Sequence, residues 1–212
     1  GHLISDLRKL EGSANDISEF FSSTASRLAN NPFLWLRGEA GSGKTHLICD
    51  IASARIENKL PTLIFLGQFF DCNNFWQEFG NLCGLSISTY DDLKTFLSIN
   101  FTKDKKLLIL IDALNESAAP EKWQSISRKL FKLASEVENL AVGLTCRTSY
   151  EPSVIHPSLN KLKSVIKTEH RGFEGSIRLA TAKFFKNFGI NSHEIPLVQD
   201  FSNPLFLKSY CI

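Results

Sequence analysis

One octapeptide constrains the fold of this chain more than any other stretch. Residues 38–45 read Gly-Glu-Ala-Gly-Ser-Gly-Lys-Thr and match the pattern G-x-x-x-x-G-K-[ST]. An apolar run at 33–36 precedes them, and a segment with helix-compatible composition at 46–58 follows them. Strand, glycine-rich turn and helix in this order form a phosphate-binding loop, because glycine lets successive N–H groups turn towards an anion. The sequence therefore predicts a P-loop within an α/β fold.

The residues of this loop have distinct expected roles. Lys44 is expected to reach the β- and γ-phosphates of a nucleotide as a positive charge, and Thr45 to give its hydroxyl to Mg²⁺. The alternative is a glycine-rich turn before an ordinary helix, which the strand and helix context does not favour. The remaining candidate nucleotide-binding residues of the loop are Gly38, Glu39, Ala40, Gly41, Ser42 and Gly43.

A second informative stretch is Leu-Leu-Ile-Leu-Ile-Asp at 107–112. Its aliphatic run predicts a central parallel strand that is buried on both faces. An acid at the carboxyl end of such a strand lies at the edge where α/β sheets bind ligands. Together with the P-loop this is a Walker B arrangement, so Asp112 is expected to hold Mg²⁺ opposite Thr45. Glu116 is a candidate general base for an attacking water, with a helix-capping surface acid as the alternative.

Three further strands complete the expected sheet, at 62–66, 139–147 and 164–169. The strand at 139–147 ends in Arg147. In P-loop ATPases with an additional catalytic acid, this strand lies between the P-loop strand and the Walker B strand. Its tip then points at the γ-phosphate, so Arg147 is a candidate sensor of that phosphate. A surface arginine at the start of a loop is the alternative. The expected fold is a five-stranded parallel sheet of order 5-1-4-3-2.

Helical patterns lie between and around these strands. Residues 1–31 are expected to form a helical segment, with its apolar stripes at 4–29, that packs on an NTPase core at 32–173. Residues 174–212 are expected to begin a small helical lid. Within the core, helices are expected at 88–101, at 120–137 and at 73–84, the last capped by Asn73 or Asn74. The aromatic residues at 69–101 are expected to be core rather than ligand surface.

Composition narrows the function classes. The formal net charge of +2 implies no strong field for a polyanion, and the lysines at 103–106 fit a solvated turn, so direct nucleic-acid binding is not favoured. The longest aliphatic run is too short to span a membrane, and no signal peptide is visible. Five scattered cysteines favour reduced thiols in the cytoplasm and give no zinc site. The absence of methionine and the apolar end at 204–212 predict that a longer protein continues beyond this chain.

With these pieces placed, the chain resembles the STAND class of P-loop NTPases, in particular its NACHT-like branch. The resemblance covers nearly the whole chain, and within the class it is most similar to the bacterial antiviral STAND NTPases of the Avs group. It rests on Gly-Glu-Ala-Gly-Ser-Gly-Lys-Thr-His at 38–46, Leu-Ile-Asp-Ala-Leu-Asn-Glu at 110–116, Leu-Thr-Cys-Arg-Thr-Ser-Tyr at 144–150 and Asn-Pro-Leu-Phe-Leu-Lys at 203–208.

The resemblance implies ATP and Mg²⁺ as ligands and slow, regulatory ATP hydrolysis. It implies a switch from an ADP-bound or empty monomer to an ATP-bound homo-oligomer, a tetramer or similar, triggered by a phage protein through a C-terminal sensor outside this chain. It adds His46 to the nucleotide-binding loop and makes Pro204 the lid proline near the adenine. One departure is Asn115, where the family commonly has an acid, which leaves the base role to Glu116 and puts the hydrolysis rate in doubt. The Avs-like sequences tolerate this Asn, so we interpret it as a trait of that subgroup.

Three other function classes stay open at this point. A motor or loader ATPase of the AAA+ type would act on nucleic acid or protein and turn over quickly when stimulated by the polymer. A small-molecule kinase would need several arginines in a substrate lid, and few lie between 147 and 190. A binding protein without hydrolysis would use the same phosphate loop.

Overall fold

The computed structural model describes residues 31–70, 72–162, 164–190 and 198–212. At its centre is a five-stranded sheet in which all neighbouring strands run parallel, with the order β2-β3-β4-β1-β5. The strands are β1 (Phe33–Gly38), β2 (Thr62–Leu66), β3 (Leu107–Asp112), β4 (Leu140–Arg147) and β5 (Val165–Glu169). Read from the other edge, this is the predicted order 5-1-4-3-2. The predicted fold class is therefore confirmed, with β5 at an edge and β4 between the P-loop strand and the Walker B strand.

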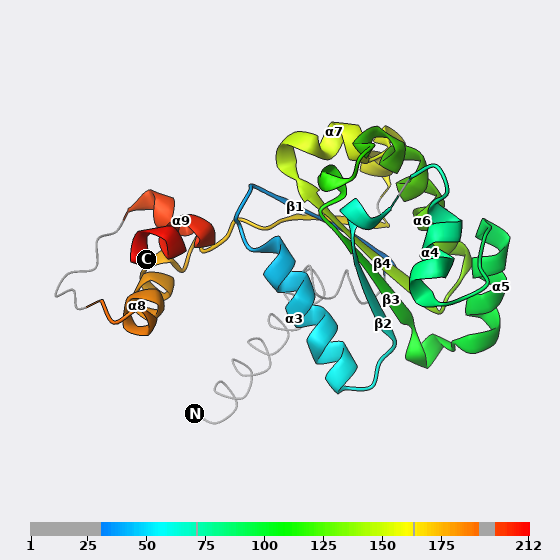
Figure 1. Ribbon diagram of the computed structural model, residues 1–212, viewed down its shortest axis with the longest axis horizontal. Helices are drawn as coiled ribbons and strands as arrows, with labels where there is room; N and C mark the ends of the chain where they lie inside the picture. Colours follow the sequence, from blue (N-terminus) through cyan, green and yellow to red (C-terminus); the bar gives the residue numbers. More distant parts are fainter. Residues whose placement is uncertain (1–30, 71, 163, 191–197) are drawn as a thin grey trace, which may run out of the picture.

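Helices pack on both faces of the sheet (Figure 1). On one face lies α3 (Lys44–Glu57), where Ile48 and Ala52 pack on Leu36 and Leu110. The other face carries α4 (Phe75–Cys83), α5 (Tyr90–Asn100), α6 (Trp123–Glu136) and the short α7 (Glu151–Val154).

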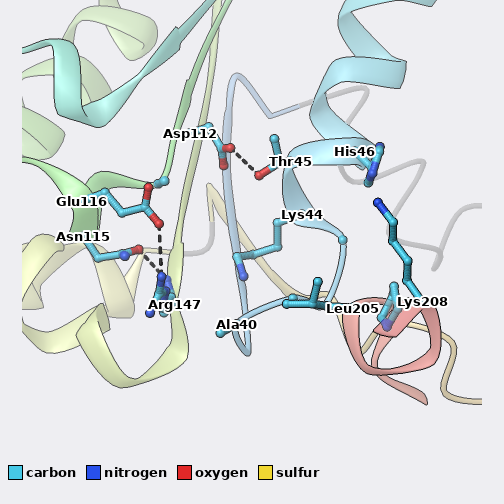
Figure 2. Close-up of a pocket in the computed structure, with 14 residues that line it drawn as sticks. Ala40, Lys44, Thr45, His46, Asp112, Asn115, Glu116, Arg147, Leu205 and Lys208 are labelled. Atoms are coloured by element: carbon cyan, nitrogen blue, oxygen red, sulfur yellow. Dashed lines mark hydrogen bonds and ion pairs between the residues drawn. The ribbon is translucent and has the colours of Figure 1, made fainter. Parts of the chain in front are cut away.

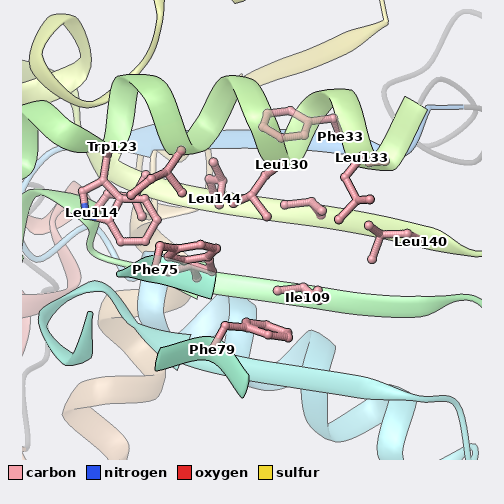
Figure 3. Packing of buried hydrophobic residues seen from close by; sticks show 14 of the residues in the cluster. Phe33, Phe75, Phe79, Ile109, Leu114, Trp123, Leu130, Leu133, Leu140 and Leu144 are labelled. Atoms are coloured by element: carbon pink, nitrogen blue, oxygen red, sulfur yellow. The ribbon is translucent and has the colours of Figure 1, made fainter. Parts of the chain in front are cut away.

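The larger core lies between the sheet and this second group of helices. Figure 3 shows Leu130 and Leu133 of α6 above the strands, with the rings of Trp123 and Phe75 at one end. Both rings are nearly inaccessible to solvent, and they meet edge to face with centroids 5.6 Å apart. This arrangement agrees with the expectation that the aromatic segment is core, except for Phe69, which is 57% exposed. The continuous apolar strands β3 and β4 follow from their burial on both faces.

The helix ends differ in part from the prediction. The helix α4 begins after Asn74, and the Asn74 side chain makes no capping hydrogen bond, so the part of the prediction that placed the cap on Asn74 is wrong. Its end at Gly84, which has φ 66°, is as predicted. The next helix, α5, has the stronger cap, because Thr89 and Asp92 bond to each other's backbone N–H groups. Residues Pro120–Lys122 form a 3-10 turn, so α6 begins at Trp123.

Two helices after β5 form a separate small cluster. They are α8 (Ile177–Asn187) and α9 (Pro204–Cys211). A 3-10 turn at Gln199–Ser202 lies just before α9. Phe185 and Phe201 lie in their shared core, which is distinct from the two clusters on the sheet. Figure 1 shows both helices beside the connection from β1 to α3, far from α4, α5 and α6.

The predicted N-terminal helix at 4–29 lies outside the described residues, and the division of the chain into three segments stays a prediction. In the part of the chain that the structure describes, no helix has the length and apolar character needed to cross a bilayer.

Candidate active site

The predicted P-loop joins β1 to α3, and the sheet brings it beside the tips of β3 and β4. Gly41 and Gly43 have φ values of 73° and 101°, a left-handed backbone conformation that side-chain-bearing residues rarely adopt. Gly43 directly precedes the first turn of α3, where backbone N–H groups have no partner within the helix. An anion in the loop would therefore meet several N–H donors and the positive end of the helix dipole.

The side chain of Lys44 folds back into this loop. Its Nζ donates to the carbonyl oxygens of Gly38 and Glu39 at 2.9 and 2.8 Å. Burial lowers the pKa of the Lys44 ammonium, and the carboxylate of Asp112 opposes that shift. A positive charge is thereby fixed within the curve of the loop, as expected of a residue that binds phosphate.

The two predicted metal residues are in direct contact. Thr45 Oγ1 donates to Asp112 Oδ2 at 2.6 Å, and Asp112 is almost completely buried (Figure 2). A hydroxyl and a carboxylate oxygen side by side beneath a phosphate loop are the hard oxygen ligands that Mg²⁺ prefers. The residues present therefore fit Mg²⁺. Among the described residues no group of three or more His, Cys, Asp and Glu could hold a metal alone.

The segment after β3 carries the candidate base towards β4. Ala113 has a left-handed φ of 54°, and the 3-10 turn Leu114–Glu116 follows it. Figure 2 shows Glu116 and Asn115 facing Arg147. Arg147 Nη2 lies 3.2 Å from Glu116 Oε1, and the Arg147 backbone N–H donates to Asn115 Oδ1 at 2.9 Å. Both charged side chains are more than two-fifths exposed, so this ion pair contributes about 1 kcal/mol or less.

The start of α9 is bonded to the backbone of the P-loop. Asn203 Nδ2 donates to the carbonyl of Ala40 at 2.9 Å, and the Leu205 N–H donates to the carbonyl of Gly41 at 3.3 Å. The same Asn203 side chain caps α9, because its Oδ1 accepts from the N–H groups of Leu205 and Phe206. One amide therefore connects the C-terminal helices to the phosphate loop.

These groups surround one cavity of ≈ 280 Å³. Most of the predicted site residues line it: Ala40, Gly41, Gly43, Lys44, Thr45, His46, Asp112, Glu116, Arg147 and Pro204. Three others are not among its lining residues. Gly38 pairs with Arg147 in the register of β1 and β4, Glu39 offers its carbonyl to Lys44, and Ser42 is buried within the loop.

The structure adds residues that the sequence interpretation missed. Lys208 lines the cavity one helical turn after Pro204, a spacing that places both on one face of α9. Thr145 bonds to Asp112, and it lies two residues before Arg147, on the same face of β4. A polar residue inside an otherwise apolar buried strand was the available signal for Thr145. No local signal marked Asn203 as a contact of the loop, because its partner is 163 residues away.

The sequence profile of the NACHT domain matches residues 33–187 of this chain. The chain belongs to the NACHT family. The match begins at β1 and ends with α8, so it includes the whole sheet of the P-loop NTPase fold. The cavity residues from Ala40 to Arg147 lie inside the match, whereas those of α9 lie beyond it.

Solved structures similar to this NACHT domain share its fold. A replication initiator DnaA bound to AMPPCP and single-stranded DNA has 12% identity and a TM-score of 0.54, over 89% of this chain and 57% of its own. Drosophila ORC bound to DNA has 13% identity and a TM-score of 0.51, and the match covers 98% of this chain and 56% of the ORC chain. AMPPCP-bound DnaA from Aquifex aeolicus has 15% identity and a TM-score of 0.50, over 81% and 51%.

The chain therefore spans little more than half the length of these structures, and at such identities the likeness concerns the fold alone. No curated protein sequence matches the chain. Family and fold together identify an ATP-binding NTPase module.

Proposed function

We propose that this NACHT domain is a Mg²⁺-dependent ATP switch that hydrolyses ATP slowly and changes the position of its C-terminal helices with the bound nucleotide. The observation that carries the proposal is the attachment of α9 to the P-loop through Asn203 and Leu205, beside the tips of β3 and β4. A nucleotide in the cavity would touch the loop, the strand tips and α9 together. A change at the phosphate end would thus reach the helices that follow.

The proposed chemistry assigns one task to each polar residue. Lys44 and the loop N–H groups bind the phosphates that ATP and ADP share. Thr45 and Asp112 hold Mg²⁺, which neutralises charge on the phosphate oxygens when bound. Glu116 takes a proton from water, whose oxygen bonds to the γ-phosphorus while the bond to the β–γ bridging oxygen breaks, giving ADP and phosphate. Arg147 stabilises negative charge on the transferred group.

The Arg147–Glu116 ion pair links the candidate base to the candidate sensor. A γ-phosphate that drew the Arg147 guanidinium towards itself would release Glu116 from this weak pair. A ligand can favour the separated arrangement over the paired one only if it binds the two with different affinities. ATP has that property, because ADP lacks the phosphate that Arg147 would contact.

The wider role rests on the resemblance. We place this NACHT domain in a cytoplasmic STAND NTPase of the antiphage type, whose ATP-bound form assembles into a homo-oligomer after a phage protein binds elsewhere in the protein. The competing function is a motor or loader ATPase on DNA, which the fold shared with DNA-bound DnaA and ORC brings into consideration.

Turnover with and without DNA separates the two functions. For the switch we expect ATP hydrolysis on the order of 10⁻² per second or slower, as in NTPases that lack an activating partner. We expect added single- or double-stranded DNA to leave that rate unchanged in a phosphate-release assay. Stimulation of tenfold or more by either form of DNA would instead favour the motor. If the chain did not bind Mg·ATP in a calorimetric titration, both the switch and the motor function would be excluded.

Replacing Arg147 by alanine is expected to remove the preference for ATP over ADP. The guanidinium would contact only the terminal phosphate, and a charge-assisted hydrogen bond to such a group contributes about 1.5–3 kcal/mol. Affinity for a non-hydrolysable ATP analogue should fall by about tenfold or more, while ADP affinity stays within about twofold. The matched control is Arg147→Lys, which keeps the charge and should retain part of the preference. Equal losses for both nucleotides in Arg147→Ala would contradict the sensor role.

A further inference from the structure

One buried hydroxyl on β4 bonds to the last residue of β3 and to the residue that follows it. Thr145 is 2% exposed, and its Oγ1 donates a hydrogen bond to Asp112 Oδ1. The same oxygen accepts from the backbone N–H of Ala113 at 2.9 Å. The directions are fixed, because a carboxylate accepts and a backbone N–H can only donate. The single proton of the hydroxyl therefore points at Asp112.

This bridge lies where the backbone ladder between the two strands stops. The register of β3 and β4 ends at Ile111 and Leu144, one residue before Asp112 and Thr145. Beyond it, Ala113 adopts the left-handed conformation, which is strained for a residue with a side chain. The Thr145 hydroxyl gives the Ala113 N–H a partner at this bend. This side-chain hydrogen bond joins the two chain segments just beyond the last backbone pair of β3 and β4.

The bend decides where Glu116 lies. The Glu116 N–H bonds to the carbonyl of Ala113 at 2.8 Å, and Leu114, completely buried, anchors the turn between them. The hydroxyl also decides how Asp112 is rotated. With Oδ1 bound by Thr145, the other oxygen, Oδ2, faces Thr45 in the P-loop. The Thr145 side chain thus contacts Asp112, the candidate metal ligand, and Ala113, whose backbone positions the candidate base Glu116.

We propose that Thr145 is a positioning residue of the ATPase site: it orients Asp112 for Mg²⁺ and, through the backbone of Ala113, places Glu116 beside the phosphates. Thr145 is separated from the cavity by Asp112 and Ala113, which themselves line it, so it acts only through them. The inference rests on the proposed function, since it assumes that Asp112 is a Mg²⁺ residue. Partners of this kind, behind a metal ligand, alter metal affinity by about 10–100-fold when they are lost.

The test compares variants that keep or remove the hydroxyl. Thr145→Val has nearly the same shape without the hydroxyl, and Thr145→Ser keeps the hydroxyl without the methyl group. Binding of a fluorescent ATP analogue is measured in EDTA and across a Mg²⁺ titration, with thermal unfolding as a check on folding. For Thr145→Val we expect about tenfold more Mg²⁺ to be needed for half-maximal enhancement of binding, with unchanged affinity in EDTA. For Thr145→Ser we expect the wild-type titration within about threefold.

A second readout follows the other half of the bridge. Loss of the hydroxyl leaves the Ala113 N–H without its partner, so hydrogen exchange at residues 113–116 should accelerate in Thr145→Val and not in Thr145→Ser. If Thr145→Val does not fold, Thr145→Cys takes its place in both measurements, because the thiol fills the position of the hydroxyl but is a weak hydrogen-bond donor and acceptor.

The outcomes separate this inference from the proposed function. A wild-type Mg²⁺ titration in the folded hydroxyl-free variant would overturn the positioning role while the ATP switch stands. Equal loss of binding in EDTA and in Mg²⁺ would also overturn it, because it would indicate a purely structural role. A wild-type chain whose nucleotide binding does not respond to Mg²⁺ at all would overturn the metal site itself, and the role of Thr145 with it.

Discussion

Replacing Lys44 by alanine is expected to reduce nucleotide affinity by a factor on the order of a hundred or more. The ammonium lies inside the loop, held by the carbonyls of Gly38 and Glu39, where the phosphates of ATP and ADP would both approach it. A hydrogen bond to a charged group contributes about 1.5–3 kcal/mol, and this ammonium can make more than one. Calorimetric titration with ADP and with a non-hydrolysable ATP analogue measures the loss, which should be similar for both.

The cavity offers a matched control for this variant. Lys208 lines the same cavity from α9, so Lys208→Ala removes an equal charge from a different element of the site. We expect that change to lower affinity by no more than about fivefold, because Lys208 is not enclosed by the loop. Nucleotide affinity of Lys44→Ala within a few-fold of wild type would contradict the P-loop assignment. Equal effects of the two lysines would indicate general electrostatic attraction instead of a specific contact.

Replacing Glu116 by glutamine is expected to stop hydrolysis while ATP binding persists. The amide keeps the size of the side chain but takes up no proton, and a lost general base lowers rates by about 10²–10⁴-fold. The exposed ion pair with Arg147 is also lost, which should change stability by no more than about 1 kcal/mol. Single-turnover hydrolysis and nucleotide affinity, measured on the same preparation, distinguish catalysis from binding.

A nearby acid provides the comparison for the Glu116 variant. Glu121 is an exposed acid of the next 3-10 turn, and it is not among the residues that line the cavity. We expect Glu121→Gln to hydrolyse ATP at the wild-type rate. Wild-type turnover by Glu116→Gln would remove Glu116 as the base. A parallel loss of ATP affinity in that variant would give it a binding role in place of a catalytic one.

The sheet and most of the cavity were predictable because their signals are local. The aliphatic run before Asp112 can be buried on both faces only inside a parallel sheet, and the P-loop fixes which strand and helix are joined. The carboxyl ends of parallel strands meet at one edge, so Asp112 and Arg147 had to lie near the loop. The same reasoning placed Glu116, since a short turn after the strand keeps it at that edge.

The parts that the sequence interpretation missed depend on contacts between distant segments. The bond from Asn203 to Ala40 requires the path of the chain after β5, which no periodicity encodes. The bridge made by Thr145 requires the register of β3 against β4. The missing cap from Asn74 has a different reason. Asn is a common capping residue, but the residue type alone does not fix the direction of its side chain.

Asn115 has a different meaning in the structure than in the sequence. The sequence interpretation treated it as an amide where the family commonly has an acid, a trait of the Avs-like subgroup that puts the hydrolysis rate in doubt. In the structure its side-chain oxygen accepts the backbone N–H of Arg147 and so joins the tips of β3 and β4. The residue joins the end of β4 to the turn that carries Glu116, the candidate base, without adding a second negative charge beside it.

The hydrogen bonds from α9 to the P-loop have a consequence for any partner of this protein. Ala40 and Gly41 receive these bonds through their carbonyls, so α9 and a nucleotide are connected through the same few peptide groups. Thermodynamic reciprocity then applies: if ATP weakens the attachment of α9 by some factor, a partner that detaches α9 strengthens ATP binding by the same factor. An activating partner would then need no contact with the nucleotide, because detaching α9 would by itself change the affinity of the P-loop for the phosphates.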